Sequence, residues 1–140
     1  MEVEFLATIA AIAPDPAASA ALYENALGLP LEGEQQDGYR HTGALDGCKH
    51  FGVWPLSQVA EACFESGEWP AERPVPQASI EFDVRSPEAV AQAAAELERS
   101  GFALLHPARE EPWGQTVARL QAPEGLIVGI THTPALRENG

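Results

Sequence analysis

Residues 78–87 of the 140-residue chain read Ala-Ser-Ile-Glu-Phe-Asp-Val-Arg-Ser-Pro, and this stretch decides the fold. Polar and apolar side chains alternate along it, which predicts a strand over 78–84 with one apolar face. Ser86 and Pro87 then predict a helix start, with Ser86 as the N-cap and Pro87 in the first turn. Apolar residues recur along one face of that helix, and Gly101 predicts its end.

The same pattern occurs 71 residues earlier in the chain. An apolar run over 5–12 precedes Asp15 and Pro16, which match the later cap and proline, and Gly28 predicts the end of the first helix. A strand, a capped helix start and a glycine stop in the same order indicate an internal repeat.

Further strands follow each helix. Asp46-Gly47 is typical of a hairpin turn, and a second turn falls at 123–125. We therefore predict strands over 38–45 and 48–54 in the first half, and over 102–106, 116–121 and 126–132 in the second, with a weaker candidate over 31–36. Each half then has the order β-α-β-β-β, which predicts an α+β fold.

The repeat suggests a division of the chain into two modules. The first module covers 1–56 and the second covers 78–132. Between them, 57–77 is predicted to form a short helix over 57–65, with Ser57 as its N-cap, and a proline-rich linker. The polar tail 133–140 is expected to fray.

Two βαβββ units over residues 5–132 resemble the vicinal oxygen chelate superfamily, which includes glyoxalase I, extradiol dioxygenases, fosfomycin-inactivating enzymes and bleomycin-resistance proteins. The residues that carry the resemblance include 27–31, 112–115 and 122–128. Pro-Trp-Gly-Gln at 112–115 is most similar to the bleomycin-resistance branch. The resemblance implies a cupped mixed β-sheet cavity with helices outside, and a homodimer.

The resemblance also implies four positions for metal ligands, on the first and last strands of each half. These positions fall on Thr8, Gly52, Ser79 and Gly129, and none of them offers an imidazole or a carboxylate. We therefore expect no metal cofactor, with a displaced divalent metal as the alternative. Glycine at two corresponding positions predicts that something comes close to the backbone there.

Strand alternation selects the side chains that share a face with those positions. His50 and Trp54 share the face of Gly52, while Glu81 and Asp83 share the face of Ser79. Trp113 is expected at the rim, by resemblance. We predict that these five residues bind a ligand. Each also has a structural alternative: a core tryptophan, a solvated carboxylate, a turn residue or a hydrogen-bonded histidine.

Other candidate residues are expected to be less informative. The two carboxylates should either remain unpaired or find a partner, such as a bound cation. Trp69 either caps the cavity or packs between subunits. His41, His106 and His132 are expected on the surface, and Cys48 and Cys63 are expected to be inert thiols.

Composition excludes some partners. With 8 Lys+Arg against 21 Asp+Glu, the formal net charge is −13, so the basic face that a nucleic acid or an anionic membrane needs is not expected. The chain has no apolar run long enough to span a membrane and its start is acidic, so we expect a cytoplasmic protein.

Two functions remain in competition. The first is a metal-free binding protein that sequesters a cationic or aromatic natural product, with capture helped by the acidic charge. The second is a lyase, isomerase or dioxygenase that uses His50 with Glu81 or Asp83, either on a displaced metal or by metal-free acid–base chemistry. A dimeric scaffold with no ligand is a third possibility.

Overall fold

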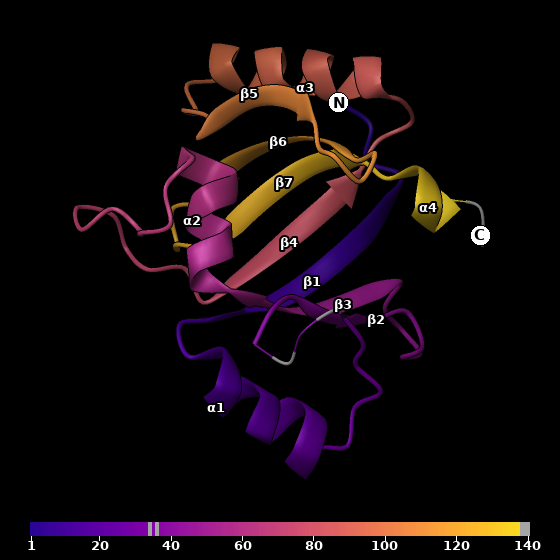
Figure 1. The fold of residues 1–140 in the computed structure, drawn as a ribbon. Helices are drawn as coiled ribbons and strands as arrows, with labels where there is room; N and C mark the ends of the chain where they lie inside the picture. The colour runs from indigo at the N-terminus through magenta and orange to yellow at the C-terminus, as the bar shows by residue number, and fades with distance from the viewer. Residues whose placement is uncertain (34, 36, 138–140) are drawn as a thin grey trace.

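Seven strands of the described residues form one open mixed sheet. The computed structural model describes all residues except 34, 36 and 138–140. The strand order is β2-β3-β1-β4-β7-β6-β5 (Figure 1). The strands are β1 (Phe5–Ala13), β2 (Arg40–Thr42), β3 (His50–Pro55), β4 (Ala78–Asp83), β5 (His106–Glu110), β6 (Thr116–Gln121) and β7 (Ile127–His132). This architecture confirms the α+β class.

The two halves of the chain lie side by side in this sheet. In each half the first strand pairs in parallel with the last, β1 with β3 and β4 with β7. The first strands of the two halves, β1 and β4, pair antiparallel and join the halves at the centre. The arrangement fits two repeated units, as the 71-residue offset predicts.

Two helices cover the outer face of the sheet. Helix α1 (Pro16–Ala20) continues into a π-helical segment, η1 (Ala21–Ala26), and α3 is Pro87–Arg99. Asp15 and Ser86 are N-caps, each accepting a hydrogen bond from the backbone three residues on, at 3.2 and 3.1 Å. Behind α3 lies a core whose buried members are Val84, Val90, Ala93, Ala94, Ala118 and Ile130.

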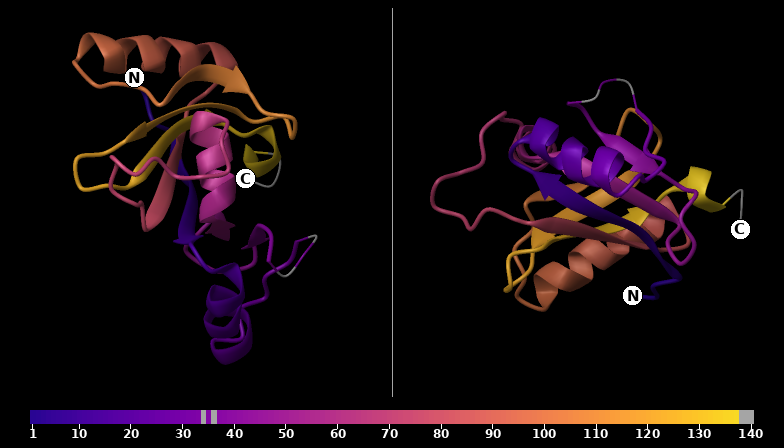
Figure 2. Two further views of the ribbon diagram at one scale, coloured as in Figure 1. Left: turned by 60° about the vertical axis from the view of Figure 1, so that its left-hand side comes forward. Right: turned by 90° about the horizontal axis from the view of Figure 1, so that it is seen from below.

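A third helix lies on the opposite, concave face. Helix α2 (Leu56–Phe64) packs Val59 and Cys63 against Ile12 of β1 and Ile127 of β7. Figures 1 and 2 show the strands curving around this side, with α1 and α3 outside and α2 within. The concave face is therefore partly covered by the chain itself.

Several sequence-based predictions were wrong in detail. Residues 102–105 form a connection rather than a strand, because Leu104 packs with the α3 core and Leu105 with α2; β5 begins only at His106. In the candidate strand 31–36, Glu32 makes one isolated bridge to His41, while positions 34 and 36 lie outside the described residues.

The helix predictions also need two corrections. Ser57 does not cap α2, because the helix already begins at Leu56, with Pro55 at the N-cap position. Part of the tail that was expected to fray forms a short helix, α4 (Pro134–Arg137). Among the described residues, no helix is long and apolar enough to cross a membrane.

The cap of α3 gives a test of the repeat's second helix start. Ser86→Ala removes the acceptor for the Ala89 N–H, so we expect the free energy of unfolding to fall by about 1 kcal/mol in urea titrations. Ser57→Ala is the matched control, because Ser57 is exposed and lies inside the first turn of α2. An equal loss in both variants would contradict the assignment of the cap.

Candidate functional site

A row of mostly polar residues crosses six strands of the concave face. The backbone register places His50, Thr8, Glu81, Gly129, Arg119 and His106 opposite one another, on β3, β1, β4, β7, β6 and β5 in turn. Residues paired in this way point to the same face of a sheet. We call these six residues the central row.

Glu81 lies at the middle of the central row and is buried. Its carboxylate accepts a hydrogen bond from Gln115 Nε2 at 3.1 Å, and the same nitrogen donates to Thr131 Oγ1 at 2.8 Å. Burial raises the pKa of Glu81, and the guanidinium of Arg119 and the Gln115 and Thr8 hydrogen bonds oppose that rise only in part. The carboxyl group therefore gains protons more readily than an exposed glutamate.

Gln115 connects Glu81 to the exposed Trp113. Gln115 Oε1 accepts a hydrogen bond from Trp113 Nε1 at 2.9 Å. An indole N–H can only donate, so the amide oxygen must face Trp113 and the amide nitrogen must face Glu81. Trp113 is 65% exposed in the turn before β6. The Pro-Trp-Gly-Gln motif thus links a surface aromatic ring to a buried carboxylate.

Tyr39 fills the space that Gly52 leaves on β3. A Cβ atom on Gly52 would lie 2.5 Å from the Tyr39 hydroxyl oxygen, so the phenol rests directly on the backbone. That hydroxyl is 2.9 Å from His50 Nε2, and the Tyr39, His41 and His50 rings stack with centroids 5.1–6.0 Å apart. Burial lowers the pKa of His50, and nearby His41 lowers it further, so His50 is neutral at pH 7.

Gly129 on β7 is likewise covered by a neighbouring side chain. A Cβ atom there would lie 3.2 Å from Glu81 Cγ, so the glutamate side chain leans over this glycine. The expectation that something approaches the backbone at both glycines is confirmed. Both approaching groups, Tyr39 and Glu81, belong to the chain itself.

Arg119 is a buried cation in the central row, next to His106 at its end. Its side chain is 2% exposed, and Nη1 lies 3.2 Å from His106 Nε2 and 3.3 Å from Glu111 Oε1. The guanidinium also lies over the Trp54 ring, 5.5 Å from its centroid. Within the described residues, Arg119 Nε is the only buried side-chain nitrogen or oxygen that lacks a hydrogen-bond partner.

His106 was expected on the surface, and that expectation was wrong, because this side chain is buried beside Arg119. Its Nδ1–H donates to the Pro107 carbonyl at 2.7 Å, since a carbonyl can only accept. Nε2 is then free to accept from Arg119. Burial lowers the pKa of His106 to about 4, so the imidazole is neutral at pH 7.

Asp83 has its partner within the chain. Its carboxylate accepts from Arg137 Nε at 2.9 Å and from the Thr133 N–H at 3.0 Å. Arg137 also reaches Glu4 Oε1 at 2.7 Å, which joins α4 to the N-terminal segment. Burial raises the pKa of Asp83 against the opposing effect of Arg137. A bound cation is not needed to balance this carboxylate.

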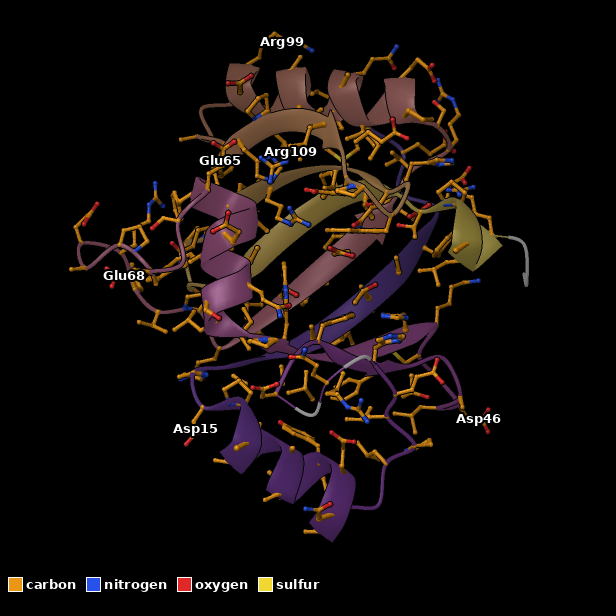
Figure 3. The ribbon with its side chains drawn as sticks, in the orientation of Figure 1. Asp15, Asp46, Glu65, Glu68, Arg99 and Arg109 are labelled. Carbon is orange, nitrogen blue, oxygen red and sulfur yellow. The ribbon has the colours of Figure 1, made fainter. Side chains whose placement is uncertain are left out.

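Helix α2 is tied across the concave face by residues of β5 and of the linker. Arg109 donates to the Ala62 carbonyl in the last turn of α2 and to Glu111 Oε1 at 3.1 Å; Figure 3 shows it beside that helix. Trp69 packs edge-on against Phe64, with ring centroids 5.2 Å apart, and donates to the Pro74 carbonyl. In this chain Trp69 therefore supports α2.

The donor set does not fit a tight divalent metal site. No group of three or more His, Cys, Asp or Glu is close enough to hold a metal ion among the residues that the structure describes. The central row contains three candidate donors: Thr8 separates His50 from Glu81, and Gly129 and Arg119 separate Glu81 from His106. Each of the three is already hydrogen-bonded. The buried guanidinium of Arg119 adds positive charge nearby, which disfavours a cation.

The sequence argument brought together His50 and Glu81, which lie in the same row. Trp54 shares their face but lies nearer α2, and Asp83 points toward α4. Tyr39, Gln115, Arg119 and His106 were missed. Gln115 lies in the motif already singled out, and Arg119 is a charged residue between the apolar Ala118 and Leu120 of a predicted strand, so both carried a signal. Tyr39 was included in the predicted strand over 38–45, but it lies in the loop just before β2, and its contact with Gly52 comes only from the fold.

Comparison with known proteins identifies the family. A model of the Glyoxalase/Bleomycin resistance protein/Dioxygenase superfamily matches residues 6–130, and the chain belongs to this superfamily. A comparison with curated proteins finds no match. The superfamily membership implied by the repeat is thereby confirmed.

Solved structures share the fold at low identity. A superfamily member from Vibrio splendidus 12B01 is 17% identical with a TM-score of 0.56, covering 92% of this chain and 100% of its own. A Mn(II)-bound glyoxalase from Novosphingobium aromaticivorans is 13% identical with a TM-score of 0.59, covering 93% of this chain and 38% of its own. Streptomyces coelicolor methylmalonyl-CoA epimerase is 15% identical with a TM-score of 0.52, covering 96% and 97%.

The Gly52–Tyr39 contact predicts a steric conflict. Gly52→Ala places a methyl group against the Tyr39 phenol, so the free energy of unfolding should fall by about 2 kcal/mol in urea titrations. In a Tyr39→Ala background the same change should cost less than about 0.5 kcal/mol. Gly67→Ala, at a position with open space, is the control. Equal costs in both backgrounds would show that Tyr39 does not occupy this space.

The Asp83–Arg137 pair predicts a pH-dependent loss of stability. Arg137→Gln leaves a buried carboxylate without its cation and should cost about 3 kcal/mol at pH 7. Because the pKa of Asp83 is already raised above 3.8 and rises further in the variant, protonation relieves the loss as the pH falls. Urea titrations at pH 7 and pH 5 should show a smaller difference at pH 5. Glu4→Gln, which removes the more exposed partner, should cost little at either pH.

Proposed function

We propose that this protein binds a small planar molecule on the concave face of the sheet and that binding does not require a metal ion. The single observation that carries the proposal is what covers the two glycines of the concave face. Two of the four expected ligand positions, Gly52 and Gly129, are glycines covered by Tyr39 and Glu81. The face thus offers aromatic rings and hydrogen-bonding groups at two positions where the resemblance places metal ligands.

The aromatic side chains support a flat ligand. Tyr39, His41, His50 and Trp54 are all half-buried, and the rings of the first three are stacked. Stacked and edge-on rings bind flat molecules through dispersion and quadrupole interactions. Trp113, exposed and held by Gln115, adds a further ring that is tied to Glu81 through hydrogen bonds.

The proposed branch of the superfamily rests on the Pro-Trp-Gly-Gln motif at 112–115. We place the protein with the bleomycin-resistance type, where it would sequester a natural product and act as a homodimer. In this structure the motif positions Trp113 and Gln115 toward Glu81, which supports a binding role for the segment. Analytical ultracentrifugation tests the dimer.

The metal independence is testable by tryptophan fluorescence. We expect planar aromatic compounds to quench the fluorescence of the full chain with the same dissociation constant in EDTA and in added Mn²⁺ or Zn²⁺, because the binding groups are side chains alone. Trp69→Phe is the control, since Trp69 packs against α2 and the linker. Turnover of small α-keto compounds that EDTA abolishes would overturn the proposal and favour a metal-dependent enzyme.

A further inference from the structure

The proposed function leaves open which charge the ligand carries, and the surroundings of Arg119 bear on that question. Two of the carboxylates around the concave face, Glu111 and Asp83, already have guanidinium partners. Glu111 accepts from both Arg109 and Arg119, at 3.1 and 3.3 Å, and Asp83 is paired with Arg137. A cationic ligand would have to compete with these fixed cations.

Arg119, by contrast, keeps an unused donor. Its Nη1 is engaged by His106 and Glu111, but Nε has no hydrogen-bond partner although it is buried. Buried polar groups are nearly always satisfied, so an unsatisfied N–H at a candidate site calls for an acceptor. The complementary group is an oxygen, and a carboxylate oxygen forms the strongest such hydrogen bond with a guanidinium.

The strand next to this donor carries no side chain at the paired position. Gly129 lies directly opposite Arg119 on β7, and Glu81 lies directly beyond it on β4. Because Gly129 has no side chain, the Glu81 side chain leans over it, toward the strand that carries Arg119. On the other side of the guanidinium, the Trp54 ring covers it and is itself half-buried. A flat ligand that displaces or slides past this ring reaches Nε while its own ring remains in aromatic contact.

We propose that Arg119 recognises the ligand: the concave face takes a planar molecule that bears an oxyanion or carbonyl oxygen, and this oxygen accepts a hydrogen bond from Arg119 Nε. The fixed positive charge of the site is then a guanidinium and not a metal ion. This inference rests on the proposed function and reverses the ligand charge that the acidic composition favoured.

Glu81 sets the charge balance of this site. Around Arg119 and Glu81 the charged and titratable groups are Glu111, Arg109, His106, Tyr39, Cys63 and Asp83. His106 is neutral at pH 7, burial keeps the Tyr39 hydroxyl and the Cys63 thiol protonated, and Asp83 is balanced by Arg137. Glu81 is therefore the carboxylate that opposes an incoming anion.

The test uses benzoate, benzamide and benzamidine, which share one ring and carry a negative, zero and positive charge. Each is titrated up to about 50 mM, where fragments of this size bind, into the ¹⁵N-labelled full chain in EDTA. We expect benzoate to bind at least about tenfold more tightly than benzamidine. The Nε–H resonance of Arg119, assigned by its absence in Arg119→Lys, should move downfield with benzoate.

The variants separate recognition from a structural role. Arg119→Lys keeps the charge but loses the Nε donor, and should weaken benzoate about tenfold while changing benzamidine little. Arg99→Lys is the control, because Arg99 lies exposed on the outer helix α3 (Figure 3). Glu81→Gln should tighten benzoate severalfold. If Arg119→Lys does not fold, the Nε–H shift in the unmodified chain decides alone.

Each outcome is informative. Benzamidine binding more tightly than benzoate would overturn this inference and leave the proposed function standing. Binding of benzoate with no movement of the Arg119 Nε–H resonance would overturn the role of Arg119 alone. No binding by any of the three, in the chain or in Glu81→Gln, would overturn both the inference and the proposed function.

Discussion

The antiparallel pairing of β1 with β4 is the constraint on which the rest of the structure depends. It joins the two halves into one sheet and places Thr8 opposite Glu81. Because side chains alternate along a strand, a shift of one residue in β4 would turn Glu81 and Asp83 toward α3 and expose Phe82 on the concave face. The apolar packing behind α3 fixes this register, and the central row follows from it.

Buried charge in this chain is compensated locally. Four of the eight cationic residues, Arg40, Arg109, Arg119 and Arg137, make ion pairs in which at least one partner is largely buried. Burying an ion is costly unless it is paired, so each of these arginines offsets the cost of a buried or partly buried carboxylate. Most acidic side chains of the described residues are exposed, so the formal charge of −13 does not indicate the charge of the concave face.

The sequence was most informative where local physics dominates. The capped helix starts at Asp15 and Ser86 and the strand that begins at Ala78 were predicted correctly, because caps and alternation depend on residues that are near one another in the sequence. The partners of the site residues were not predicted. Arg137 and Asp83 are 54 positions apart in the sequence, and only the folded chain brings α4 beside the end of β4.

The two glycines show why the site cannot be inferred from motif positions alone. At Gly52 and Gly129, the missing side chain is replaced by a neighbour, Tyr39 from the loop before β2 and Glu81 from the adjacent strand. Restoring a histidine or carboxylate at either position would require Tyr39 or Glu81 to leave first, and both are hydrogen-bonded where they lie. The two glycines therefore allow Tyr39 and Glu81 to occupy their positions on the concave face.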